Sequence, residues 1–240
     1  MRDWMMRVPF WSALEERQKT AAVTLFLSTV VMITWRYFGS AEFYREHLAD
    51  RLALGLDPRA AAAWYRFVTG FALLGLMPAL IGGHLLGRGL ASYGVRLGIL
   101  VRTVRSAALL APIFIFLGWI SSHDPSMARC FPTNPAAGSS LAMFALHAAI
   151  YLLHYAGWEF HFRGFLQMGL RDSLGDGNAL LVQVMASTLV HIGSPAIETY
   201  GAIAGGILWG ILAYRTQSLL SGMVQHACLG IALDAFLCFR

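Results

Sequence analysis

The chain has 240 residues, of which 57% are hydrophobic and 13% are charged, whereas charged residues make up about 25% of an ordinary soluble domain. Together with a mean hydropathy of +0.58, this composition predicts an all-α integral membrane protein and argues against a soluble enzyme. The formal net charge is +5, but most arginines lie between apolar segments, where positive charge sets membrane orientation. We therefore expect the lipid bilayer as a partner and no nucleic acid.

The first part of the chain, residues 1–20, is polar and carries charges of both signs. It lacks the short apolar core and small-residue cleavage site of a secretory signal peptide. We expect this segment to remain on the protein as a cytoplasmic amino-terminal segment.

Apolar segments follow one another along the rest of the chain, and each is close to the roughly 20 residues that a membrane-spanning helix needs. They cover residues 21–38, 68–87, 106–122, 139–155, 179–192, 196–214 and 219–237, with a polar loop expected over 39–67. The segment at 179–192 is short for a full crossing. The sequence predicts one bundle of about seven to eight transmembrane helices.

The arginines are distributed unevenly between these segments. Arg88, Arg96, Arg102 and Arg105 lie between the second and third segments without an acidic residue among them, whereas the loop over 123–137 carries a single arginine. Because cytoplasmic loops are enriched in Lys and Arg, this bias predicts a cytoplasmic amino terminus.

The fourth apolar segment runs on into a charged motif, Trp158-Glu159-Phe160-His161-Phe162-Arg163-Gly164. Ionisable groups at membrane depth are costly, and those that occur usually pair with each other and face a protein interior. Glu159 and Arg163 lie about 40° apart around a helix, so the arginine can hold the carboxylate. The placement favours a functional pair over a purely structural one.

Histidines form a second stripe on the same helix. His147, His154 and His161 recur every seven residues, and such a stripe drifts by only about 20° per step. This face is well separated from the side of Glu159, so the two cannot point equally well at one site. For each histidine, a structural hydrogen bond is the simpler interpretation.

Further polar groups occur in the last segments. His191 closes one apolar segment and Glu198 begins the next. His226 lies inside the final segment, where Gly230 and Asp234 follow at steps of four residues along the same face. We expect His226 and Asp234 to line a common polar seam.

Five of these groups together are sufficient for a water-holding catalytic pocket, namely Glu159, Arg163, His191, Glu198 and His226. A carboxylate and an imidazole can deprotonate a water, while a second imidazole donates to the oxygen that becomes negative as the water attacks a carbonyl. That chemistry is amide hydrolysis and needs no cofactor. A zinc site with His191, His226 and a carboxylate as ligands remains an alternative.

Other intramembrane proteolytic chemistries fit the sequence less well. The chain contains no His-Glu-x-x-His motif, and no glycine stands two residues before Ser221. Aspartyl chemistry needs a pair of membrane aspartates, but Asp176 lies in a glycine-rich stretch and Asp234 stands alone.

The order and spacing of these motifs resemble the CAAX protease and bacteriocin-processing (CPBP, or Abi) family of intramembrane glutamic endopeptidases, over about Leu152 to Asp234. That family has Glu-Glu-x-x-x-Arg-Gly, then a histidine that closes a helix, then a histidine followed four residues later by Asn or Asp. The first motif is matched by Glu159, Arg163 and Gly164, the second by His191 and the third by His226.

The resemblance implies a bacterial inner-membrane endopeptidase that acts on a membrane-anchored protein or peptide. Residues 139–240 would be its catalytic helical core, preceded by transmembrane helices and loops over 21–138. It implies Glu159, His191 and His226 as catalytic residues, and the supporting residues would be Arg163, Glu198, Trp158, His161 and Asp234.

The sequence departs from the family pattern at three positions. Trp158 stands where the leading glutamate belongs, Ser187 replaces a phenylalanine, and Gly230 replaces the Asn or Asp that helps to hold the attacked carbonyl oxygen. Substitutes for the last are Asn178, Gln183 or Asp234. These departures motivate a second hypothesis, a catalytically inactive membrane scaffold or peptide-binding protein. A proton-coupled transporter fits less well, because the two halves show no paired inverted segments.

Overall fold

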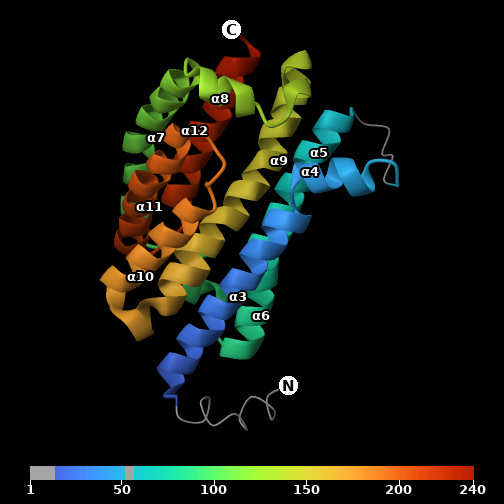
Figure 1. The fold of residues 1–240 in the computed structure, drawn as a ribbon. Helices are drawn as coiled ribbons and strands as arrows, with labels where there is room; N and C mark the ends of the chain where they lie inside the picture. Colours follow the sequence, from blue (N-terminus) through green and yellow to red (C-terminus); the bar gives the residue numbers. More distant parts are fainter. Residues whose placement is uncertain (1–13, 52–56) are drawn as a thin grey trace.

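The computed structural model describes residues 14–51 and 57–240, so residues 1–13 of the predicted cytoplasmic segment lie outside the described residues. The described residues form helices and connecting turns, with no strand (Figure 1). In chain order the helical elements are α3 (Glu16–Phe38), α4 (Ala41–Phe43), η1 (Tyr44–Leu48), α5 (Pro58–Gly70), η2 (Phe71–Leu76), α6 (Met77–Leu86), η3 (Leu90–Tyr93), α7 (Leu100–Ser122), α8 (Pro125–Cys130), η4 (Pro135–Ser139), α9 (Leu141–Glu159), η5 (Phe160–Met168), α10 (Gly169–Leu189), α11 (Ala196–Thr216) and α12 (Leu220–Cys238).

Within the described residues, six helical runs are long and apolar enough to cross a membrane, which confirms the predicted all-α integral membrane bundle. The longest run, Leu141–Leu189, contains a backbone reversal at Gly175, whose φ of 76° and ψ of 163° are not helical. Glycine adopts positive φ without steric cost, so the helix can turn there. This run therefore contains both the fourth and the fifth predicted segments.

The predicted polar loop over 39–67 is wrong in both halves, because α4 and η1 occupy Ala41–Leu48 and a long helix begins in the second half. Pro58 begins α5, because Asp57 accepts hydrogen bonds from two backbone N–H groups of the first turn and proline is well tolerated at a helix start. The helix then continues through η2 and α6, so the second span is longer than its hydropathy indicated. The first and third spans also begin earlier than predicted, at Glu16 and Leu100.

The segment that carries the charged motif occupies the centre of the bundle. In Figure 1, α9 crosses the molecule between α3, α5 and α6 on one side and α7, α10, α11 and α12 on the other. Every residue from 157 to 170 is buried. Gly157 permits close packing against α5, because a β-carbon at this position would lie 2.8 Å from the Gly70 carbonyl oxygen. The fold thus holds Glu159 and Arg163 in the protein interior.

The outer surface of the bundle is apolar, whereas the ionisable side chains at its centre face the interior. Helix α7 exposes Leu109, Ile113 and Phe116, among other large apolar side chains. Lipid is the natural environment of such a surface, whereas ionisable groups at the same depth face inward.

Candidate functional site

Glu159 lies at the junction of α9 and η5 and is only 1% exposed. Its Oε1 atom accepts a hydrogen bond of 3.2 Å from Arg163 Nη1 and one of 2.9 Å from His226 Nδ1. The first contact follows from the four-residue spacing along a helix. The second joins α9 to α12 across the bundle, so the carboxylate is held from two directions.

The ring of His226 is fixed by aromatic neighbours. It stacks on Trp209 with ring centroids 4.2 Å apart, and the ring of Tyr155 lies 4.7 Å away. Arg163 lies over the other partner of this stack, 5.3 Å from the Trp209 ring. Because Nδ1 donates to Glu159, Nε2 is the ring nitrogen that remains for other contacts.

A second carboxylate and histidine meet where α10 ends and α11 begins. The Nδ1 atom of His191 lies 2.6 Å from the carbonyl oxygen of Ser187, and its Nε2 lies 3.8 Å from Glu198 Oε1. The hydroxyl of Thr199 donates to the His191 carbonyl and steadies the intervening turn. The two histidines are similarly exposed, His191 at 16% and His226 at 17%, but the Glu198 side chain is 25% exposed whereas that of Glu159 is 2% exposed.

The indole of Trp158 touches both histidines. Its ring centroid lies 5.2 Å from that of His191 and 6.4 Å from that of His226, edge-on in both cases. Glu159 contacts His226 directly, whereas His191 pairs with Glu198. The predicted groups therefore form two carboxylate–histidine pairs connected by one indole, and not a single cluster around Glu159.

Two predicted supporting residues lie elsewhere. The Nε2 atom of His161 is 2.7 Å from the hydroxyl of Ser28 on α3. Asp234 is bonded to His147 at 2.8 Å, with both side chains fully buried. The expected polar seam of His226 and Asp234 is therefore wrong, because a histidine of α9 takes up the Asp234 carboxylate.

The space beside Gly230 is occupied by Tyr155, whose hydroxyl lies where a β-carbon of residue 230 would be. The alternatives expected from the sequence have other partners, since Asn178 donates to a carbonyl of its own helix and Gln183 to a carbonyl of α11. Tyr155 was not among the predicted site residues. Its position four residues before Glu159, on the same helical face, is the signal that could have found it.

Arg66 was also missed. This residue of α5 lies with its guanidinium 5.6 Å from the Trp35 ring, and its charge acts on Glu198. It brings a positive charge to the side of the bundle where the second pair lies. A lone arginine inside an apolar helical run is the sequence signal for such a role.

Within residues 14–51 and 57–240, no three His, Cys, Asp or Glu side chains come together in a way that could hold a metal ion. The zinc alternative therefore lacks a preformed set of ligands among these residues. The chemistry considered below uses only the side chains of the protein.

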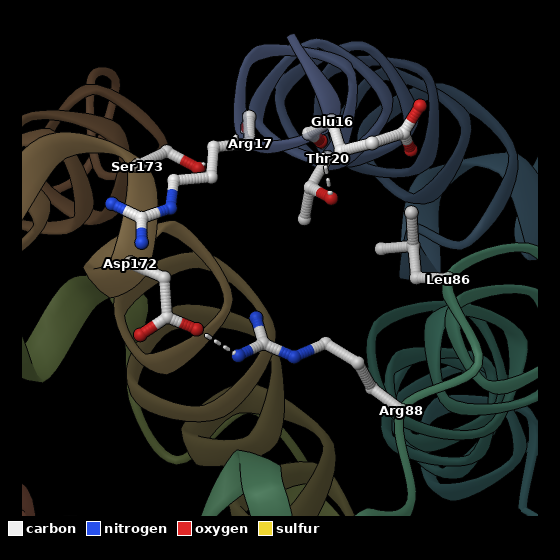
Figure 2. A pocket seen from close by; sticks show the side chains of 7 residues that line it. All are labelled: Glu16, Arg17, Thr20, Leu86, Arg88, Asp172 and Ser173. Atoms are coloured by element: carbon white, nitrogen blue, oxygen red, sulfur yellow. Dashed lines mark hydrogen bonds and ion pairs between the residues drawn. The ribbon is translucent and has the colours of Figure 1, made fainter.

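A cleft of about 420 Å³ lies at the end of the bundle where α3 begins (Figure 2). Its lining residues are Glu16, Arg17, Thr20, Leu86, Arg88, Asp172 and Ser173. Figure 2 shows Arg88 directed at Asp172, with which it forms an ion pair, and Arg88 also donates to the Gly169 carbonyl at 3.0 Å. None of the predicted site residues lines this cleft.

Residues 139–232 match the family model described as "Type II CAAX prenyl endopeptidase Rce1-like". The match confirms the resemblance to the CAAX protease family over this segment. It includes both carboxylate–histidine pairs as well as Trp158. No curated protein and no solved structure is significantly similar to the chain.

Proposed function

We propose, on the premise that residues 139–232 belong to the Rce1-like CAAX endopeptidase family, that the chain hydrolyses a peptide bond of a membrane-associated protein. The observation that carries the proposal is the 2.9 Å contact between Glu159 and His226, which joins two helical runs long and apolar enough to span a membrane and holds a carboxylate that is 2% exposed. A carboxylate, an imidazole and a guanidinium are costly to bury at membrane depth, and ionisable groups found there usually mark a functional site.

The reaction needs a base for the attacking water and a donor for the negative oxygen that forms. His226 suits the second role, because as an imidazolium it donates from both nitrogens and Glu159 offsets its charge. Glu159 then fixes the ring through Nδ1 and leaves Nε2 for the substrate oxygen. The sequence-based assignment of Glu159 as the base, with His191 and His226 beside it, stays a prediction.

The orientation of the protein is part of the proposal. The arginine-rich stretch that begins at Arg88 lies at the same end of the bundle as the start of α3, since Glu16 and Arg88 line one cleft. Because positive charge is retained on the cytoplasmic side, we place this end in the cytoplasm. The membrane that we propose is a bacterial inner membrane.

A cleavage assay tests the proposal. The purified protein is incubated in lipid vesicles with a library of membrane-tethered peptides, and the products are identified by mass spectrometry. The variant His226→Ala should cleave at least about 100-fold more slowly, because a positioned donor to the oxyanion is lost. The matched control His47→Ala changes an exposed histidine of η1 and should cleave at the wild-type rate. Full activity of His226→Ala would refute the proposed role.

The alternative is a scaffold that binds a membrane peptide without cutting it, and Trp158 is the observation that favours it. Its indole packs edge-on against the rings of both histidines, which the proposed reaction would place around one substrate bond. If the protein is a scaffold, the wild-type protein and His226→Ala should capture tethered peptides equally well, and neither should yield a cleavage product.

A further inference from the structure

When the His191 ring is neutral, both atoms that face each other in its contact with Glu198 accept hydrogen bonds. The Ser187 carbonyl, 2.6 Å from His191 Nδ1, can only accept, so Nδ1 carries the ring proton. In the neutral ring, Nε2 then presents a lone pair. Glu198 Oε1 presents another at 3.8 Å, beyond the length of a direct hydrogen bond.

A water molecule between the two acceptors would satisfy both of them. Its two O–H groups can donate to Nε2 and to Oε1, since a point about 2.8 Å from each atom exists when the two are this far apart. Such a water would have its own lone pairs directed away from both acceptors. The second carboxylate oxygen of Glu198 is buried without a hydrogen-bond partner, which leaves this group further capacity to accept.

Glu159 is less suited to hold that water. Its Oε1 already accepts from Arg163 and His226. Its Oε2 lies against Gly222 of α12, where a β-carbon would come within 3.1 Å of it, and like Glu198 Oε2 it has no hydrogen-bond partner. The side chain is 2% exposed, against 25% for Glu198.

We propose that Glu198, together with His191, binds the attacking water and accepts its proton. This assignment rests on the proposed function and names the catalytic base of that reaction. Glu159 is then a positioning residue that acts through His226.

The step is balanced without any further reactant. The water oxygen forms a bond to the carbonyl carbon, one water proton moves to Glu198, and the carbonyl electron pair moves to oxygen, where His226 donates. The C–N bond then breaks, the amine nitrogen takes the proton from Glu198, and a carboxyl group and an amine are released.

The variant Glu198→Gln tests the assignment, because it keeps the shape of the side chain and removes the proton acceptor. We expect kcat to fall by about 100-fold to 10,000-fold, with KM for the tethered peptide unchanged within about twofold. In Glu198→Gln, the rise of the cleavage rate with pH that reports deprotonation of the base should be lost. Glu159→Gln should retain that rise even where its rate falls.

The matched control Glu42→Gln, at an exposed glutamate of α4, should keep the wild-type rate. The thermal unfolding midpoint of Glu198→Gln in detergent should equal that of wild type, which separates loss of chemistry from loss of fold. A wild-type protein that cleaves, with His226→Ala inactive and Glu198→Gln fully active, would overturn this inference alone. A wild-type protein that cleaves no tethered peptide would overturn the proposed function itself.

Discussion

The two carboxylate–histidine pairs on either side of Trp158 differ in how tightly they are closed. Glu159 and His226 touch at 2.9 Å in the interior with Arg163 as a third partner, whereas His191 and Glu198 face each other over 3.8 Å at two helix ends. In the closed pair the carboxylate contacts the imidazole directly and orients it. In the open pair the facing atoms are 3.8 Å apart, and the water that we propose would lie between them. On this proposal, direct contact positions a side chain, whereas separation leaves a place for the attacking water.

The largest expected effect on stability comes from breaking the closed pair. Glu159→Gln leaves the Arg163 guanidinium buried without an anion, and arginine cannot shed its proton. We expect a loss of about 3–5 kcal/mol in the free energy of unfolding, measured by chemical unfolding in detergent. The double variant Glu159→Gln, Arg163→Gln should recover much of this loss.

The open pair supplies the contrast for that experiment. Glu198→Gln should change the free energy of unfolding by less than about 1 kcal/mol, since no buried charge is left unpaired. Equal destabilisation by Glu159→Gln and Glu198→Gln would contradict the division into a closed and an open pair.

A third pair, His147 and Asp234, provides an intermediate effect. Both of its side chains are fully buried, more so than those of the closed pair, and its hydrogen bond joins His147 to Asp234 without involving Trp158, Glu159 or His191. In His147→Leu, the Asp234 carboxyl can take up a proton, so we expect a smaller loss of about 1–3 kcal/mol. At a temperature where the variant is fully folded, its cleavage rate should match wild type. A cleavage defect at that temperature would show that burial alone does not separate structural pairs from functional ones.

The smallest expected effect concerns pH and lies outside the spans. The Asp124 carboxylate accepts hydrogen bonds from Ser126 and from backbone N–H groups of α8, and these lower the pKa of Asp124 below its usual value. The stabilisation is therefore complete above the unfolded pKa and is lost as pH falls through the folded pKa. Asp124→Asn should show a slightly flatter decline of the unfolding midpoint between about pH 5 and pH 3. An identical decline would contradict the role of this cap.

Several features followed from the sequence because they depend on local spacing. Composition indicated the helical membrane bundle, and the four-residue interval from Glu159 to Arg163 indicated their pairing. The helix start at Pro58 was missed, because the residues that follow it include arginines that lower the mean hydropathy of the segment.

Contacts between helices did not follow from the sequence. The shared face of His226 and Asp234 was a correct local inference, but periodicity along α12 does not say which neighbour lies opposite each turn. His147 of α9 lies opposite Asp234, and Glu159 lies opposite His226. Arg66 was missed for the same reason, since only the packing of α5 brings it near Glu198.

The close approach of Tyr155 to Gly230 has a consequence for how variants of this protein are read. Any side chain at position 230 would overlap the tyrosine hydroxyl, so every single replacement there should impair folding. A mutational scan that changes one position at a time would thus score Gly230 as indispensable and suggest a catalytic part for it. Paired libraries that vary positions 155 and 230 together would expose the mutual dependence. They would also show whether a smaller residue at position 155 allows an asparagine side chain at position 230.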